Sequence, residues 1–330
     1  MKIKYLVIRF SSIGDIVLTT PVLRCLKQQV EGAGVHFVTK KRHASIVASN
    51  PYIDKVHVLK ESLPELINEL EKEQFDYIID LHQNIRSNQI KSRLNIPSFS
   101  FQKLNFKKYL LVRFKINRMP DKHIVDRYME TLKIFDVKND NKGLDFFIPE
   151  NENYPVSGLP KAFQSGYIAF VIAGTFPTKR LPAEKIIEIC NGIDYPVILL
   201  GGKNEQQEAE RIMAAVRKNV IDFAGKISLN QSASLVKNAR LVLTNDTGLM
   251  HIAAAFKKKI LSFWGNTVPE LGMVPYQSDP ASEIMEVKDL KCRPCSKLGY
   301  RKCPKKHFRC MKDLDSRRSI NWINRHFPKK

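Results

Sequence analysis

Short apolar runs recur along the chain, separated by stretches in which apolar residues return every three or four positions. The first pattern is typical of strands buried on both faces of a parallel sheet, and the second of amphipathic helices covering that sheet. The predicted strands are residues 5–10, 35–39, 53–59, 77–81, 166–172, 196–200 and 241–243, and a further strand ends the stretch 241–265. Because strands and helices alternate, the sequence predicts an α/β fold with right-handed crossovers.

The predicted helices follow these strands, and a polar linker divides them into two groups. They are residues 16–29, 62–73, 128–135, 187–190, 229–237 and 249–256, with an amphipathic closing helix over 314–328. Pro21 lies inside the first helix and predicts a local irregularity. A polar segment at 138–143 precedes proline and glycine positions between 149 and 160, so we predict domains over 1–155 and 156–330.

The strand at 241–243 leads into the clearest candidate binding site. Free N–H groups at the start of the next helix suit a phosphate, and ligands of open α/β sheets bind at the carboxyl ends of strands. Asp246 can accept hydrogen bonds from sugar hydroxyls, while Thr247 can cap the helix and Gly248 lets a ligand approach. His251, one turn later, can donate to a diphosphate. A capped helix with a buried structural histidine explains the same spacing.

Residues 246–251, D-T-G-L-M-H, resemble the donor-site motif of glycosyltransferase family nine, the ADP-heptose:lipopolysaccharide heptosyltransferases. The resemblance extends over most of the chain. It implies the GT-B fold, in which two Rossmann-like, doubly wound domains face each other across a cleft. It also implies a donor site that contains Asp246, Thr247, Gly248, Leu249 and His251.

The loop after the first strand, S-S-I-G-D at 11–15, carries the candidate catalytic base. It lacks the G-x-G-x-x-G fingerprint of dinucleotide-binding proteins. A carboxylate at this position points to where a base would act, although Asp15 could simply complement the helix N-terminus. With Thr19-Thr20-Pro21 the loop is similar to the opening motif of the family, which implies that Asp15 is the base and that Ser12 and Gly14 lie beside the acceptor.

The turn after strand 166–172 carries the candidate groups for the donor diphosphate. Gly174 and Thr175 offer backbone amides, and Lys179 is a point charge that can neutralise a leaving diphosphate with help from Arg180. The turn resembles the family's donor-phosphate segment, with Leu181 where an aromatic residue is often found.

Glu205 follows strand 196–200 and is placed to bind ribose hydroxyls. The family carries a glycine-then-glutamate turn here with different spacing, so Glu208 is an alternative to Glu205.

Two segments of the first half are candidate acceptor contacts. Arg86 and Ser87 follow strand 77–81 in a stretch that resembles the family's D-L-x-x-x-x-R-S segment, although a surface loop with one arginine is common. Residues 121–127 resemble a histidine-bearing segment near the family's acceptor site, which implies His123 and Arg127 as contacts.

The formal charge of +21 indicates an anionic partner: a nucleic acid, an acidic membrane surface or a phosphorylated glycolipid. Residues 103–118 mix basic with apolar side chains, a composition that suits an anionic membrane or lipid acceptor and equally a solvated helix face. No apolar run is long enough for a membrane span and no signal-peptide pattern appears, so we expect a cytoplasmic protein, peripheral on the inner membrane.

Four cysteines cluster near the C-terminus, at Cys292, Cys295, Cys303 and Cys310. They could form a tetrahedral zinc site with His307 as a competing ligand, or remain reduced thiols. Cys25 and Cys190 are isolated and are expected to be core thiols. We predict no metal among the catalytic groups and no cofactor.

These features together predict an inverting glycosyltransferase. It would move a sugar, by the resemblance heptose, from an ADP-sugar to a phosphorylated lipopolysaccharide core acceptor, with positive charge replacing a metal. One alternative is a family-nine-like transferase with a different sugar donor. Another is a basic nucleic-acid-binding protein whose C-terminal segment holds a zinc-like set of four cysteines. The latter leaves Asp15 and Asp246 without a task, so we expect no nucleic-acid partner.

Overall fold

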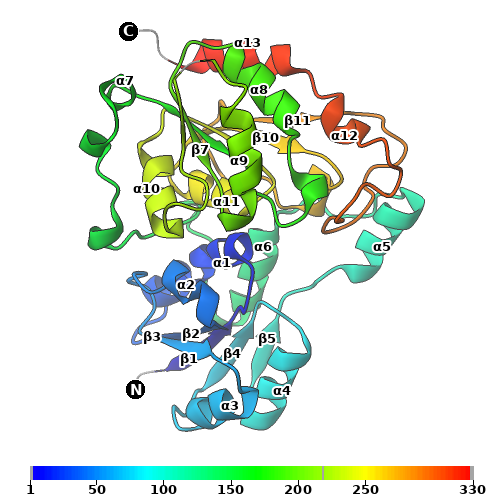
Figure 1. The fold of residues 1–330 in the computed structure, drawn as a ribbon. Helices are drawn as coiled ribbons and strands as arrows, with labels where there is room; N and C mark the ends of the chain where they lie inside the picture. Colours follow the sequence, from blue (N-terminus) through cyan, green and yellow to red (C-terminus); the bar gives the residue numbers. More distant parts are fainter. Residues whose placement is uncertain (1–2, 218, 328–330) are drawn as a thin grey trace. The chain divides into compact units, whose positions relative to one another are not determined.

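The computed structural model describes residues 3–217 and 219–327 and divides into two compact units. Unit 1 comprises Met1–Leu104 and Lys122–Phe147, and unit 2 comprises Asn105–Asp121 and Ile148–Lys330. Each unit contains one parallel sheet with helices packed on it (Figure 1). The assignment of acceptor binding to residues 1–155 and donor binding to 156–330 stays a prediction.

Unit 1 contains a five-stranded sheet with the order β3-β2-β1-β4-β5, in which every pair is parallel. The strands are β1 (Lys4–Ile8), β2 (Gly34–Lys40), β3 (Lys55–Leu59), β4 (Tyr77–Asp80) and β5 (Ser98–Ser100). Val7 in the central strand β1 lies opposite Phe37 on one side and Ile79 on the other. All three side chains are fully buried, because this sheet is covered on both faces.

The helices of unit 1 follow the predicted pattern only in part: the helix Ile85–Leu94 was not predicted, and the helix predicted over 128–135 is α-helical only to Met129 and continues as a 3-10 turn. They are α1 (Ile13–Val17), α2 (Thr20–Gln29), α3 (Leu63–Glu71), α4 (Ile85–Leu94) and α6 (Ile124–Met129), with 3-10 turns at Lys41–Ile46 and Glu130–Phe135. The single helix predicted over 16–29 is wrong, because α1 ends at Val17 and α2 begins at Thr20. Pro21 lies in the first turn of α2, where its missing N–H breaks no helical hydrogen bond.

Unit 2 contains a six-stranded parallel sheet with the order β11-β10-β9-β6-β7-β8. The strands are β6 (Ile168–Val171), β7 (Val197–Leu200), β8 (Val220–Asp222), β9 (Leu241–Asn245), β10 (Lys259–Trp264) and β11 (Glu283–Glu286). The α-helices are α5 (Asn105–Phe114), α7 (Lys161–Gln164), α8 (Ala183–Asn191), α9 (Gln206–Met213), α10 (Leu229–Asn238), α11 (Gly248–Ala255), α12 (Arg309–Lys312) and α13 (Ser316–His326). Short 3-10 turns lie at Glu150–Glu152, Val156–Gly158, Pro177–Lys179, Lys203–Glu205 and Pro269–Leu271.

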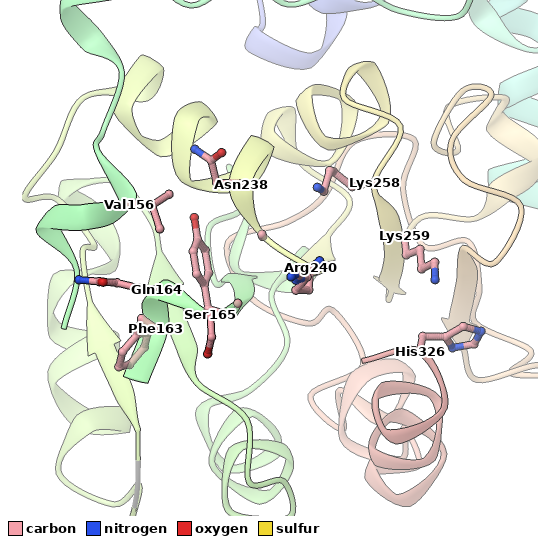
Figure 2. Close-up of a pocket in the computed structure, with 12 residues that line it drawn as sticks. Val156, Phe163, Gln164, Ser165, Asn238, Arg240, Lys258, Lys259 and His326 are labelled. Atoms are coloured by element: carbon pink, nitrogen blue, oxygen red, sulfur yellow. The ribbon is translucent and has the colours of Figure 1, made fainter. Parts of the chain in front are cut away.

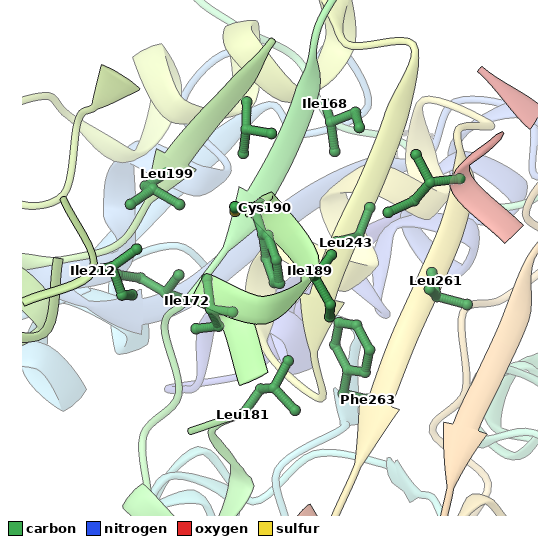
Figure 3. Packing of buried hydrophobic residues seen from close by; sticks show 14 of the residues in the cluster. Ile168, Ile172, Leu181, Ile189, Cys190, Leu199, Ile212, Leu243, Leu261 and Phe263 are labelled. Carbon is green, nitrogen blue, oxygen red and sulfur yellow. The ribbon is translucent and has the colours of Figure 1, made fainter. Parts of the chain in front are cut away.

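The core of unit 2 forms where strand side chains meet α8, α9 and the C-terminal helices. Figure 3 shows Ile168, Leu243 and Leu261 from three neighbouring strands together with Ile189 of α8. The strand residues that alternate with these, such as Ala169, are also buried, so the sheet is covered on both faces. Burial of this apolar surface is the main source of stability for the loops that the sheet carries.

Both sheets change winding direction beside their first strand. In unit 1 the chain adds β2 and β3 on one side of β1 and then β4 and β5 on the other. In unit 2 it adds β7 and β8 on one side of β6 and then β9, β10 and β11 on the other. Ligands of such sheets bind beyond the carboxyl ends of the strands at this switch point. The loops after β1 and β4, and those after β6 and β9, are therefore where ligands are expected.

Residues 105–121 lie within the first half of the sequence but pack as part of unit 2. Leu111 of α5 forms a small apolar cluster with Val268 and Leu271. Lys115 Nζ also donates to the carbonyl oxygen of Pro294 at 2.6 Å. Over the described part of the chain, the structure contains no helix of the length and apolarity that crossing a bilayer requires.

The predicted closing helix is confirmed as α13, which begins with Asp315 as its N-cap. Its indole and aliphatic side chains, Trp322 and Ile323, are buried in the core of unit 2. Pro328, the last residue of the prediction, lies outside the described residues.

Candidate functional site

Asp15 lies in the first turn of α1, directly beyond the carboxyl end of β1. Its Oδ2 atom accepts hydrogen bonds from the Ser12 hydroxyl at 2.6 Å and from the Ser12 backbone N–H at 3.1 Å. Its Oδ1 atom pairs with the Arg9 guanidinium at 2.6 Å. These contacts hold the Asp15 carboxylate in one orientation. The side chain is 22% exposed, so the carboxylate still meets solvent. Gly14 is buried in the same turn.

Arg9 is buried behind this carboxylate and was not predicted as a site residue. Besides Asp15 it donates to the carbonyl oxygens of Ser11 and Leu81 and to the Tyr128 hydroxyl. Burial alone would lower the pKa of Arg9, but Asp15, Tyr128 and Asp80 together outweigh burial and the pKa is raised. Arg9 is therefore a permanent charge that fixes the position of Asp15.

The loop after β4 is organised by Asp80, which is fully buried. Its carboxylate accepts hydrogen bonds from the Ser87 hydroxyl at 2.8 Å and pairs with Lys91 Nζ at 3.0 Å. Ser87 is also fully buried, and its hydroxyl accepts from the Asn84 backbone N–H at the start of α4. Ser87 therefore stabilises the conformation of this loop. Arg86, the other predicted acceptor contact of this segment, is exposed.

Arg86 lines a basic pocket of about 380 Å³ on unit 1. The pocket is lined by Lys40, Lys41, Arg42, Leu59, Lys60, Glu61, Leu63 and Arg86. Partial burial and the charges of Arg42 and Arg86 lower the pKa of Lys40. An anionic group entering this pocket would relieve that repulsion.

The predicted contacts His123 and Arg127 lie at α6. His123 is the N-cap, and its Nδ1 atom accepts a hydrogen bond from the Val125 N–H at 3.2 Å. Arg127 is buried and donates to the Gln102 carbonyl oxygen at 3.3 Å. Its Nε and Nη2 atoms are buried and find no hydrogen-bond partner within residues 3–217 and 219–327. Burial lowers the pKa of Arg127, so an anion at these donors would stabilise it.

Thr247 is the N-cap of α11, at the carboxyl end of β9. It adopts the extended backbone of an N-cap, yet its hydroxyl makes no capping bond. The Oγ1 atom is buried and has no hydrogen-bond partner in the described part of the chain. An unpartnered hydroxyl beside the free N–H groups of a helix is an arrangement that a bound oxyanion would complete. Gly248 and Leu249 begin the helix, and His251 is buried one turn later.

Lys179 and Asp246, both predicted as donor contacts, form an ion pair. Lys179 Nζ lies 2.5 Å from Asp246 Oδ2, although the two residues come from loops after different strands, β6 and β9. The same oxygen accepts a hydrogen bond from the Thr267 hydroxyl at 3.0 Å. The pair joins the two loops that flank the switch point of the sheet.

Arg180 and Glu205 form a second such pair, with Arg180 Nη2 at 2.5 Å from Glu205 Oε1. The other oxygen of Glu205 accepts from the Gly202 N–H at 2.9 Å, and Arg180 Nε donates to the Gly174 carbonyl oxygen at 2.7 Å. Arg180 also packs on Gly174 so closely that an added Cβ would lie 2.9 Å from its Cγ. Thr175 is exposed in the same loop, and the alternative Glu208 is half-buried on α9.

Two polar residues after β10 were missing from the predicted site. One is Thr267, whose hydroxyl holds the Asp246 carboxylate. The other is Asn266, which is buried, and neither its amide oxygen nor its amide nitrogen has a hydrogen-bond partner among residues 3–217 and 219–327. An Asn-Thr pair directly after a buried strand was the available sequence signal, since polar residues at a strand's carboxyl end face the ligand region.

A pocket of unit 2 lies at the opposite end of the strands from the candidate donor loops. It has a volume of about 420 Å³ and is lined mainly by residues just before or at the start of β6, β9 and β10, with His326 of α13. Figure 2 shows Arg240, Lys258, Lys259 and His326 around it. Because these are the amino ends of the strands, the pocket is not part of the candidate donor site.

The four clustered cysteines are free thiols in unit 2. Burial raises the pKa of Cys295 to about 11 and that of Cys310 to about 12, so both are protonated near neutral pH. Cys292 Sγ lies 3.9 Å from His307 Nε2. Among the described residues, the ligand atoms that converge within 4.8 Å of one another belong to a different cluster, in unit 1.

Comparisons with known proteins agree with this architecture. A family model described as glycosyltransferase family 9 (heptosyltransferase) matches residues 64–304. Lipopolysaccharide heptosyltransferase 1 of Campylobacter coli is 23% identical over 288 residues, which cover 80% of this chain and 84% of that protein.

Two solved structures show the fold. The glycosyl transferase family 9 protein of Veillonella parvula DSM 2008 matches with a TM-score of 0.79 and 21% identity, covering 98% of this chain and 97% of that one. The E. coli heptosyltransferase WaaC with ADP-2-deoxy-2-fluoro heptose matches with a TM-score of 0.67 and 19% identity, covering 98% and 99%. The predicted GT-B fold class is confirmed by these likenesses, and the family model matches well over half of the chain. The protein is thus a glycosyltransferase and belongs to glycosyltransferase family 9, the heptosyltransferase family.

Proposed function

We propose that this enzyme transfers heptose from ADP-heptose to a phosphorylated lipopolysaccharide core acceptor, with inversion at the anomeric carbon and Asp15 as general base. The observation that carries the proposal is the Asp15 carboxylate, which Arg9 and Ser12 hold at the switch point of unit 1 while it remains open to solvent. A base must be both oriented and reachable by the proton that it removes.

The donor and acceptor classes are supported by relatives. The relative in Campylobacter coli is named a lipopolysaccharide heptosyltransferase, and the E. coli WaaC structure contains an ADP-linked heptose analogue. The groups of unit 2 suit such a donor, because its diphosphate needs cations and N–H donors while its sugar and ribose need carboxylate acceptors.

The proposed reaction is a single displacement. Asp15 takes the proton from an acceptor hydroxyl, and the acceptor oxygen forms a bond to the anomeric carbon of the donor. The bond from that carbon to the diphosphate oxygen breaks, and its electron pair leaves with ADP. Attack opposite to the leaving group inverts the configuration. The products are the glycosylated acceptor, ADP and a protonated Asp15 that returns its proton to water.

Unit 2 would stabilise the leaving ADP. Lys179 neutralises the charge that develops on the diphosphate, and the Thr247 hydroxyl and the first N–H groups of α11 donate to its oxygens. We assign sugar contacts to Asp246, diphosphate contacts to His251 and Arg180, and ribose contacts to Glu205. Thr175, Gly248 and Leu249 complete the predicted donor site. With Lys179 in this role the reaction uses no divalent metal, and chelators are expected to leave the rate unchanged.

Unit 1 would hold the acceptor through its anionic groups. The basic pocket that includes Lys40, Arg42 and Arg86 suits a phosphate or carboxylate, and the open donors of Arg127 suit another. His123, Ser12, Gly14 and Ser87 are the remaining predicted contacts, with Ser87 acting through the loop that it shapes.

The enzyme is also proposed to bind the anionic inner-membrane surface through α5, close to its lipid-linked acceptor. Phe106, Tyr109 and Phe114 of this helix are 71%, 56% and 56% exposed, which is unusual for side chains of this size. Lys107, Lys108 and Arg113 lie between them, and residues 103–120 contain no acid. Exposed aromatic residues among cations are typical of segments that lie on anionic bilayers.

The test of the catalytic proposal is ADP release from ADP-heptose in the presence of a phosphorylated core acceptor, combined with the anomeric configuration of the product. Asp15→Asn keeps the size of the side chain and removes its basicity, so kcat is expected to fall about 10²–10⁴-fold. Asp136→Asn is the matched control, because Asp136 is exposed, in unit 1 and left-handed in conformation, which asparagine tolerates.

A retained configuration in the product would rule out the single displacement. Normal turnover by Asp15→Asn would remove Asp15 as the base. Turnover with another nucleotide sugar but not with ADP-heptose would favour a transferase with a different donor.

The membrane proposal has a separate test, sedimentation with vesicles of phosphatidylethanolamine and phosphatidylglycerol. The double variant Phe106→Ser, Phe114→Ser is expected to bind at least tenfold more weakly, since each change removes one exposed aromatic anchor. Ile134→Ser is the control, because Ile134 is 67% exposed but belongs to unit 1 and not to α5. Equal binding by both variants would contradict a role for α5.

A further inference from the structure

Three metal-ligating side chains converge in unit 1 away from the groups assigned above. They are His36 of β2, His57 of β3 and Glu73, which follows α3. The register places Val38 opposite His57, so His36 and His57 project from the same face of the sheet. Each residue offers one ligand atom, and these atoms all lie within 4.8 Å of one another.

The distances within this cluster are close to those of a metal site. His36 Nδ1 and His57 Nε2 are 3.0 Å apart, and Glu73 Oε2 lies 3.8 Å from His36 Nδ1. A tetrahedral zinc ion with bonds of about 2.0–2.1 Å places its ligand atoms roughly 3.3 Å apart. The third distance, between the ligand atoms of His57 and Glu73, is at most 4.8 Å, so the Glu73 side chain would turn inward to complete the site around an ion. Both rings are buried, and Phe75 packs edge-on against them.

The surroundings orient the ligand atoms inward. His57 Nδ1 lies 2.6 Å from Glu69 Oε1, and a carboxylate there favours the tautomer in which Nε2 carries the lone pair. Lys55 pairs with Oε1 of Glu73 at 2.5 Å, while Oε2 lies 3.8 Å from His36 Nδ1 and 3.9 Å from Lys4 Nζ.

We propose that His36, His57 and Glu73 bind Zn²⁺ or a similar divalent transition metal, with water as the fourth ligand. Two imidazoles and one carboxylate are a ligand set that such ions accept. Glu73 and Lys55 are partly exposed, so the ion and its water have a path from solvent. The ion ties β2 and β3 to the end of α3 and is structural, because Asp15 lies at the other, carboxyl end of the strands.

A single proton shared between His36 and His57 would produce a similar arrangement without an ion. The two explanations differ in one measurable respect. Only a metal site responds to added metal with a change in spectrum and in melting temperature, and only in chains that keep the ligands.

The experiment is Co²⁺ and Zn²⁺ titration of the full chain after chelator treatment. Wild-type protein is expected to show visible d–d bands of tetrahedral Co²⁺ at one ion per chain, without a thiolate charge-transfer band from the cysteines of 292–310. A saturating excess of Zn²⁺ raises the melting temperature by roughly 5–10 °C. His36→Gln and Glu73→Gln lose both responses, and Glu69→Gln binds about 10–100-fold more weakly.

His43→Gln is the matched control, since His43 is a buried histidine of the same unit outside the cluster, and it is expected to keep both responses. Glu73 is partly exposed, so Glu73→Gln is expected to fold and tests the proposal even if a histidine variant does not fold. Equal cobalt spectra and equal melting shifts in wild type and Glu73→Gln would overturn the proposal. Absence of binding by wild type at micromolar metal would also overturn it.

Discussion

The two units use the same strand order at their switch points but expose opposite charges there. In unit 1 the ion pair has its cation inside, since the Arg9 side chain is 10% exposed and that of Asp15 is 22% exposed. In unit 2 the order is reversed, with 16% for Lys179 against 10% for Asp246. The pair of Arg180 and Glu205 follows the second pattern, with 23% against 7%. The partner that is buried decides whether a loop offers a carboxylate or a cation to solvent.

The difference in exposed charge between the two units can be tested most directly at Lys179. Lys179→Met keeps the length of the side chain and removes its charge, so kcat is expected to fall about 10²–10³-fold if the cation stabilises the leaving diphosphate. Lys185→Met is the control, because Lys185 forms only a half-exposed pair with Glu188 on α8. Steady-state kinetics decide, and equal kcat values in the two variants would show that unit 2 does not use this cation.

The buried cation of unit 1 can be tested by Arg9→Lys, which keeps the charge but cannot reach all the partners of Arg9. The guanidinium contacts Asp15, Ser11, Leu81 and Tyr128, and one ammonium group cannot replace these contacts. We expect the free energy of unfolding to fall by about 2–3 kcal/mol, measured by urea denaturation. A loss below about 0.5 kcal/mol would mean that Arg9 is not the anchor of the loop.

The units are also expected to differ in their response to acid. Burial lowers the pKa of His43 and of His82 to about 4, and both lie in unit 1. The unfolded state, with a pKa of about 6.5, binds more protons between these values, so stability is greatest above pH 6.5 and falls as the pH drops towards 4.

The lowered pKa of each histidine corresponds to a loss of at most about 2 kcal/mol in the free energy of unfolding at pH 5. Solvent near the partly buried rings reduces this loss to about 1 kcal/mol per histidine. Hydrogen exchange at pH 7 and pH 5 should therefore show faster opening of the unit 1 strands at the lower pH. His43→Gln should reduce this difference, and unchanged exchange in unit 1 would contradict the prediction.

The smallest expected effect concerns Thr247, and it has opposite signs for activity and stability. Thr247→Val replaces the unpartnered hydroxyl with a methyl group of similar size, so the unliganded protein is expected to gain up to about 1 kcal/mol. The same change removes a donor to the diphosphate and lowers kcat/KM about tenfold. Thermal melting and kinetics on one preparation test both, and a loss of stability would indicate a capping role in place of phosphate binding.

The sequence pattern was sufficient for the central strands of both sheets. Strands such as β1 and β9 are continuous apolar runs because both faces are covered, and their carboxyl ends locate the candidate loops. The short edge strands β5, β8 and β11 were not predicted, since their side chains are mostly half-buried or exposed and give no apolar run. Edge strands need little burial and therefore leave a weak signal.

The sequence was enough to predict which positions belong to the candidate site, but not which residues these side chains contact. Asp15, Lys179 and Asp246 stood out because reactive residue types follow buried strands. The ion pair of Lys179 and Asp246 and the hydrogen bond from Thr267 join loops that are distant in sequence, and no local pattern encodes such contacts. The His36 and His57 cluster escaped for the same reason, since each histidine reads as one polar residue within an otherwise apolar strand.

Because residues 105–121 pack with unit 2, neither unit is a single stretch of chain. A genetic cut at residues 155 and 156 would separate Leu111 from Val268 and Leu271 and leave that apolar cluster incomplete. Hybrid enzymes that exchange unit 2 between relatives therefore need three seams, after residues 104, 121 and 147. Recombination at a single crossover would produce mismatched halves, so natural shuffling of these units is constrained by the path of the chain as well as by chemistry.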